Sequence, residues 1–180
     1  MDGDLAAKVD RLLSYEAIRQ LAYRYALATD SRDIDGLVAL FIDDVRVGRD
    51  TYGRDALRAD FERSLSAIGV SILQVTNHVI DFDDDDHARG VVYCYAQTEQ
   101  GGEWIVQQIQ YRDTYERRDD VWHFVRRIHW LWYGADVLTR PLGLTPADYR
   151  RGVWGKGELP EAFTTWAPFW ERAGRPAPTL

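Results

Sequence analysis

Four long stretches rich in β-branched and aromatic residues follow one another in the second half of the chain, at about 72–82, 88–99, 103–116 and 121–133. Only short turn-like clusters separate them: a run of four aspartates, a Gly-Gly pair and Arg118-Asp119-Asp120. Long strands joined by such short turns pair as antiparallel neighbours. The sequence therefore predicts a four-stranded antiparallel meander.

Three helices are predicted before this sheet. Apolar residues recur at helical spacing over 10–29, and the resulting stripe places Tyr25 on the inward face. Asp33 is a suitable N-cap for a short helix ending near Phe41, and a third helix is expected after Gly53. Helices followed by a long antiparallel sheet indicate an α+β fold, in which a curved sheet wraps the helices and leaves a concave pocket.

The length of 180 residues, 46% of them hydrophobic, suits one core. We expect one α+β domain over 1–134 and a C-terminal extension over 135–180. The extension loses periodicity but keeps Trp154, Trp166 and Trp170, which are poor choices for a solvated tail. It is therefore expected to pack on the pocket mouth or on a neighbouring subunit of a homodimer or homotrimer.

The charge and composition limit the partners. A formal charge of −7 with no Lys/Arg-rich stretch argues against nucleic acid, and no segment approaches the length of a membrane span. An aromatic content of 13% favours a small apolar ligand, such as a ring compound. The acidic amino terminus and the single cysteine, Cys94, predict a cytoplasmic protein in which this thiol is a small buried hydrophobe.

The sequence lacks the motifs of cofactor and metal chemistry. It has no phosphate loop, nucleophile elbow or dinucleotide fingerprint, and its four histidines lack the spacing of a metal pair. The aspartate run over 83–86 lacks the alternating ligands and final glutamate of a calcium loop, so a solvated turn is favoured. We therefore expect proton transfer by side chains alone, with no cofactor and no metal.

Two residues are candidates for that chemistry. Strand alternation places His78 on one face with Thr76 and Ile80, which we interpret as the concave face. Asp30 ends the first helix, where the helix dipole disfavours a carboxylate, so a partner is expected there. The alternatives are a satisfied core histidine and an aspartate that caps a local turn.

The span from about Tyr15 to Tyr133 resembles the SnoaL-like branch of the nuclear transport factor two superfamily. The resemblance depends on Tyr15-Glu16-Ala17-Ile18-Arg19-Gln20-Leu21, on the helix end Arg24-Tyr25-Ala26-Leu27-Ala28-Thr29-Asp30, on His78, and on Tyr115-Glu116-Arg117-Arg118 leading to Trp122. Within that branch the chain is most similar to enzymes of the scytalone dehydratase and hexachlorocyclohexane dehydrochlorinase type. The resemblance implies a cone-like α+β barrel and cofactor-free elimination by a His-Asp pair.

Carried over by position, the resemblance makes His78 the general base, Asp30 its orienting partner and Arg127 an assisting arginine. Tyr25 stands where the dehydrochlorinase has a lysine, and it is expected to help stabilise a developing oxyanion. Thr98 lies near the place of the second pocket histidine of scytalone dehydratase.

Further pocket residues are expected on the long strands. Alternation along the last strand puts His123, Val125 and His129 on the face of Arg127, so His129 is expected to reach the pocket. Tyr111, with Thr98 and His129, completes the predicted substrate-binding set, although it could also be a core aromatic.

Three functions remain open from the sequence. The first is a lyase that eliminates water from an apolar, cyclic or polyketide-like substrate. The second is an isomerase or polyketide cyclase that uses the same base. The third is a small-ligand-binding or assembly module in which His78 is merely buried.

Overall fold

The computed structural model describes residues 2–138, 143–164, 166–172, 174 and 176–177. Its helices are α1 (Asp2–Ser31), α2 (Ile34–Ala39), α3 (Arg54–Ser66) and α4 (Trp166–Arg172), with one 3₁₀ turn, η1 (Tyr149–Arg151). Its strands are β1 (Ser71–Phe82), β2 (His87–Gln100), β3 (Glu103–Arg118) and β4 (Val121–Asp136). These elements confirm the predicted α+β class.

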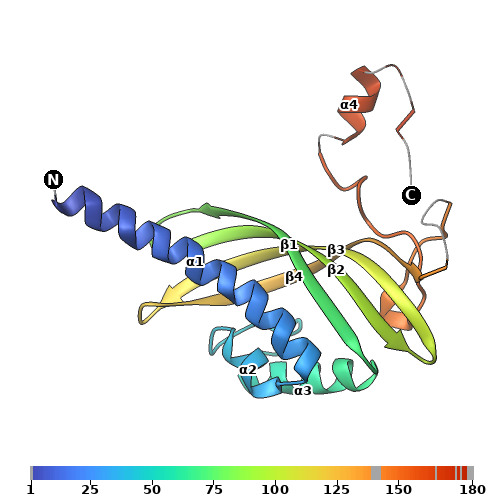
Figure 1. Ribbon diagram of the computed structural model, residues 1–180, viewed down its shortest axis with the longest axis horizontal. Coiled ribbons are helices and arrows are strands. Elements are labelled where there is room, and N and C mark those ends of the chain that lie inside the picture. The colour runs from blue at the N-terminus through green and yellow to red at the C-terminus, as the bar shows by residue number, and fades with distance from the viewer. Residues whose placement is uncertain (1, 139–142, 165, 173, 175, 178–180) are drawn as a thin grey trace.

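The sheet is the predicted meander, in the order β1-β2-β3-β4, with every neighbouring pair antiparallel. The turns use positive φ as two-residue hairpins require: Gly101 and Gly102 lie at 61° and 90°, and Asp119 and Asp120 at 49° and 61°. In Figure 1 the sheet curves around α1, and α2 and α3 lie beside the C-terminal end of that helix. This arrangement is the cone expected for the fold.

The first helix begins well before the predicted start near residue 10. Its amino-terminal half is exposed, since Leu5 and Val9 keep 64% and 46% of their surface accessible. Leu13, the first residue of the predicted inward stripe, is 65% exposed, and burial begins only where the helix meets the sheet, with Ile18 and Ala22 fully buried. Among the described residues, no helix has both the length and the apolar character needed to cross a membrane.

The short second helix begins as predicted. The carboxylate of Asp33 accepts a hydrogen bond from the Gly36 backbone N–H at 2.9 Å, which is an N-cap. Gly53, at a φ of 93°, precedes the third helix. Both helices pack their apolar residues, including Leu37 and Leu57, toward α1 and the sheet.

The sheet has three register shifts; one lies at Trp132 of β4, and the other two bear on the predicted faces. In β1 the register slips between Val75 and His78, so Thr76 is exposed and does not share the face of His78 as predicted. In β4 the register slips at Val125, because Phe124 pairs with Tyr115 whereas Arg126 pairs with the next residue back, Thr114.

The slip in β4 corrects a second prediction about faces. Phe124 and Trp122 are buried on the interior side with Arg127, while His123 is turned outward and bonds the Val121 carbonyl. Simple alternation across the bulge therefore assigned His123 to the wrong face. His129, which lies beyond the bulge, keeps the predicted face with Arg127.

The aspartate run forms a charged turn. Asp83 pairs with Arg89, Asp85 with Arg11 and Asp86 with Arg117, while Asp84 accepts from the ring of His87. Each carboxylate thus has a cationic or imidazole partner. No three metal-ligating side chains gather anywhere in the part of the chain that the structure describes.

Part of the C-terminal extension lies along the free edge of β4. Backbone N–H groups of Gly134, Gly157 and Leu159 bond the carbonyls of Gly155, Trp132 and Leu131 at 2.9 to 3.1 Å. Trp154 packs so closely on Gly134 that a β-carbon there would lie 2.5 Å from the indole. In Figure 1, α4 stands away from the sheet. The side chains of Trp166 and Trp170 fall outside the described part of the protein.

Candidate active site

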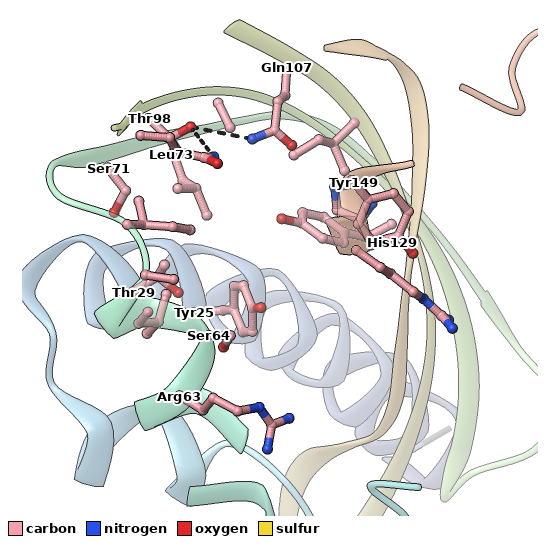
Figure 2. Close-up of a pocket in the computed structure, with 18 of the residues that line it drawn as sticks. Tyr25, Thr29, Arg63, Ser64, Ser71, Leu73, Thr98, Gln107, His129 and Tyr149 are labelled. Atoms are coloured by element: carbon pink, nitrogen blue, oxygen red, sulfur yellow. Dashed lines mark hydrogen bonds between the residues drawn. The ribbon is translucent and has the colours of Figure 1, made fainter. Parts of the chain in front are cut away.

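A cavity of about 800 Å³ opens between the C-terminal end of α1, α3 and the interior face of the sheet. Figure 2 shows its walls, with Tyr25, Thr29 and Arg63 on the helices and Thr98, Gln107 and His129 on the strands. The extension contributes Tyr149, Arg150 and Trp154. The cavity therefore combines apolar and aromatic walls with a few polar groups, as small-molecule sites do.

Two phenols of one wall stack on a buried guanidinium that lies behind them. Arg127 places its guanidinium carbon 4.4 Å from the ring centre of Tyr25, 4.3 Å from that of Tyr111 and 4.4 Å from that of Phe124. Burial raises the pKa of both Tyr25 and Tyr111, so their hydroxyls stay protonated at neutral pH. Both phenols line the cavity and can donate to a ligand oxygen.

His129 is the histidine of the cavity wall. Its ring lies against Tyr111 and Tyr149, with centroids 5.8 and 5.3 Å apart, and its buried Nδ1 has no hydrogen-bond partner among the residues that the structure describes. Burial lowers the pKa of His129 to about 4, although Glu158 opposes this shift. The imidazole is therefore neutral near pH 7, as a general base must be.

Neutral hydrogen-bonding groups line another part of the cavity. The Thr98 hydroxyl accepts from the side-chain amides of Gln100 and Gln107 at 3.0 and 3.5 Å, and Figure 2 shows the second of these bonds. Thr29 has a buried hydroxyl that finds no partner in the described part of the chain. These groups suit a ligand hydroxyl or carbonyl. The structure thus places Thr98, Tyr111 and His129, the predicted substrate-binding residues, on one cavity.

The predicted hydrogen bond between Asp30 and His78 is absent. The carboxylate of Asp30 accepts from the Ser71 hydroxyl at 3.1 Å and from the Leu73 backbone N–H at 2.9 Å. His78 lies five residues beyond Leu73, about 16 Å along an extended strand at ~3.3 Å per residue. Asp30 therefore links the end of α1 to the start of β1, through the Ser71 hydroxyl and the Leu73 backbone N–H.

Replacing Asp30 with alanine is expected to lower the free energy of unfolding by about 1–3 kcal/mol, because two partly buried donors lose their acceptor. Asp81→Ala, an exposed substitution on the same strand, is expected to change it by less than about 0.5 kcal/mol. Urea denaturation of both variants checks the difference. An Asp30→Ala protein that kept its stability but lost activity would place this carboxylate in the chemistry.

His78 belongs to a different network on the interior face. Tyr115 donates to Asp113 at 2.8 Å, so its oxygen is free to accept from His78 Nε2 at 3.0 Å. Arg127 donates to both Asp113 oxygens, at 2.9 and 2.7 Å. Burial lowers the pKa of His78 to about 4, with Asp113 opposing the shift. His78, Asp30 and Arg127 are not among the residues that line the 800 Å³ cavity, whereas Tyr25 is.

Sequence reasoning missed Asp113 and Tyr115. Both were inside a predicted strand, and alternation from Tyr111 would have placed them on the same face. A second signal was Gly90 in the neighbouring strand. A β-carbon at Gly90 would lie 2.8 Å from the Tyr115 ring and 3.1 Å from His78 Nε2, so glycine makes room for the network.

Burial of Cys94 confirms its predicted character. The thiol is 1% exposed and unpaired, and burial raises its pKa to about 12. It is therefore protonated at neutral pH and has no thiolate to act as a nucleophile.

Solved structures share this architecture. A scytalone dehydratase-like protein from Novosphingobium aromaticivorans is 24% identical, with a TM-score of 0.63, over 74% of this chain and 93% of that one. A hexachlorocyclohexane dehydrochlorinase from Novosphingobium barchaimii is 23% identical, with a TM-score of 0.66, over 74% of this chain and 96% of that one. An NTF2-like protein with a cystatin-like fold from Novosphingobium aromaticivorans is 27% identical, with a TM-score of 0.59, over 71% and 87% of the two chains.

The sequence comparisons give the family. No curated protein matches the chain. The model of the SnoaL-like domain matches residues 10–128, which run from the buried half of α1 into β4 and include most of the cavity wall. The fold, the cavity and this match agree, and the protein belongs to the SnoaL-like domain family of the NTF2-like superfamily.

Proposed function

We propose that the protein is a cofactor-independent lyase that eliminates water from a small, largely apolar hydroxy-carbonyl compound bound in the cavity. The observation that carries this proposal is a neutral imidazole, His129, beside two protonated phenols, Tyr25 and Tyr111, on one cavity wall. The likeness to proteins named as a dehydratase and a dehydrochlorinase supports elimination as the reaction class.

The reaction follows from these groups. His129 removes the proton next to the substrate carbonyl, while the phenols of Tyr25 and Tyr111 donate hydrogen bonds to the oxygen on which negative charge develops. The carbon–oxygen bond of the hydroxyl then breaks with its electron pair, and the His129 imidazolium returns the proton to the departing oxygen. The products are a conjugated carbonyl compound and water, and the imidazole is neutral again.

The choice of His129 departs from the sequence-based proposal of His78. His129 lies on the cavity wall, and its ring contacts Tyr111. His78 bonds Tyr115 instead and lacks the predicted Asp30 partner. We therefore assign His78 to the positioning of Asp113 and Arg127 behind the phenols.

The proposal predicts enone formation that depends on the phenols. Cyclic β-hydroxy ketones incubated with the protein and EDTA should give a rising enone absorbance, and Tyr111→Phe should lower kcat by at least about 10²-fold. Tyr93→Phe, on the opposite face of the sheet, is the matched control and should change little. Turnover that is unaffected by Tyr111→Phe would contradict the proposed oxyanion contact.

The absent Asp30–His78 bond favours a second candidate, a non-catalytic binding module. Such a module would bind the same ketones with an affinity that stays nearly flat with pH and would form no enone. An isomerase or cyclase would instead exchange the substrate α-proton with deuterated solvent without releasing water. Proton NMR of the ketones in D₂O with the protein separates these cases from elimination.

A further inference from the structure

A second lobe of about 460 Å³ adjoins the cavity at the free edge of β4. The two spaces are neighbours, since both are lined by Tyr25, Asp60, His129, Tyr149 and Arg150. The lobe lies between two attachments of the β4 edge. Phe124 bonds Leu40 and Ile42 on one side, and Leu131 bonds the extension on the other. Residues 126–129, between these attachments, line the second lobe.

The lining of this lobe is strongly basic in a protein whose net charge is −7. Four arginines line it: Arg46, Arg126, Arg127 and Arg150. The single carboxylate among the lining residues is Asp60, which is paired with Arg63. Within the described residues, no ion pair includes Arg46, Arg126 or Arg150. The guanidinium of Arg46 donates to the backbone carbonyls of Gly48 and Arg49. Three of the four guanidinium groups therefore lack a counter-charge, which favours an anion in the lobe.

The deepest of these arginines also has a free donor. The Arg127 side chain is 4% exposed, and its Nε and Nη2 bond Asp113. Its Nη1 is buried and finds no acceptor among the described residues. A buried guanidinium nitrogen without an acceptor is costly, and a ligand oxygen in the lobe would satisfy it.

We propose that the second lobe binds the carboxylate of the substrate, through Arg126, Arg150 and the unpaired Nη1 of Arg127. This inference builds on the proposed elimination and names its substrate class: a hydroxy-carbonyl compound that carries a carboxylate a few bonds from the reacting carbon. The carboxylate in the second lobe would hold the adjacent carbon beside His129, which lines both lobes.

The test uses binding rather than turnover. 2-Naphthoate and 2-naphthamide share a ring system that fits the large lobe, but only the first is an anion at pH 7.5. Isothermal titration calorimetry at low ionic strength should show naphthoate binding at least about tenfold more tightly than naphthamide. This ratio should fall as salt is raised, because screening weakens charge contacts at the open mouth.

Two matched double variants test whether the preference for naphthoate over naphthamide comes from the second lobe. The double variant Arg126→Gln/Arg150→Gln should bring the ratio of naphthoate affinity to naphthamide affinity close to one, because it weakens the binding of the anion far more than that of the neutral amide. The control variant Arg11→Gln/Arg89→Gln also removes two positive charges, but at the aspartate turn, and it should leave the affinity ratio at its original value. An affinity ratio near one in the unaltered protein overturns the inference. A tenfold ratio that the double variant Arg126→Gln/Arg150→Gln leaves in place overturns it as well. Loss of the elimination activity alone would not, because binding needs no turnover.

Discussion

His129→Asn is expected to lower kcat/KM for the elimination by about 10²–10⁴-fold, the usual contribution of a positioned general base. Asparagine keeps a polar side chain of similar reach but cannot take up the proton. His78→Asn is expected to lower kcat/KM by less than about tenfold, because it alters only the bond to Tyr115. Steady-state kinetics with melting temperatures for both variants separates the two histidines. A larger loss in His78→Asn than in His129→Asn would return the role of base to His78.

The pH dependence of the unaltered protein gives an independent check on this base. Burial lowers the pKa of His129 to about 4, so kcat/KM should rise with pH through that value and stay flat from about pH 6 upward. If the base had the ordinary imidazole pKa of 6.5, kcat/KM would still be rising at pH 7. A profile that levels off only above pH 7 would contradict the buried base.

The same shifts make folding depend on pH. Burial lowers the pKa values of His78 and His129 to about 4, below the ordinary value of 6.5. Between these values the unfolded chain binds more protons than the native one, so stability should fall as pH drops from about 6.5 toward 4. His129→Asn should weaken this decline, since one of the two titrating groups is gone.

The architecture could be predicted because the signals for it are local. The lengths of the four strands and their Gly-Gly and Asp-Asp turns specify an antiparallel meander without reference to distant contacts. The inward position of Tyr25 follows from helical spacing in the same way. The resemblance to the SnoaL-like branch rests on these same segments, and the family match confirms it.

The site was harder to predict because it depends on register. A two-residue turn at Asp119-Asp120 without a bulge would pair Asp113 with Arg126, and the slip at Val125 moves the partner to Arg127. A bulge has no reliable signature in a single sequence, yet it decides which arginine is buried. The predicted Asp30–His78 bond was wrong for a similar reason. His78 was chosen because histidine is a suitable partner for aspartate, but the fold places Leu73 beside Asp30.

Asp113→Ala is expected to destabilise the protein by about 3–5 kcal/mol, the largest stability effect that the structure predicts. The side chains of Arg127 and Asp113 are 4% and 0% exposed, so the substitution would leave a guanidinium buried without its counter-charge. Tyr115 would lose its acceptor as well. A loss of this size is a large part of the ~5–15 kcal/mol that stabilises most domains. Urea denaturation should show the midpoint shifting strongly downward.

The chain offers a matched control on another hairpin. Asp83 accepts from Nε and Nη2 of Arg89, as Asp113 does from Arg127, but the Arg89 and Asp83 side chains are 66% and 43% exposed. Water replaces the carboxylate there, so Asp83→Ala should cost less than about 1 kcal/mol. Equal losses in Asp83→Ala and Asp113→Ala would mean that burial of the second pair does not matter.

A second substitution tests whether the cost comes from the unpaired charge. The double variant Asp113→Leu/Arg127→Met replaces the ion pair with apolar side chains, which stabilise buried positions about as well as ion pairs do. It should therefore be more stable than Asp113→Ala, although Tyr115 still lacks its acceptor. Because Arg127 stacks on Tyr25 and Tyr111, the double variant should also alter the cavity wall and lose activity while it remains folded. A double variant no more stable than Asp113→Ala would show that the cost lies in lost packing and in the Tyr115 bond, and that the buried charge contributes little.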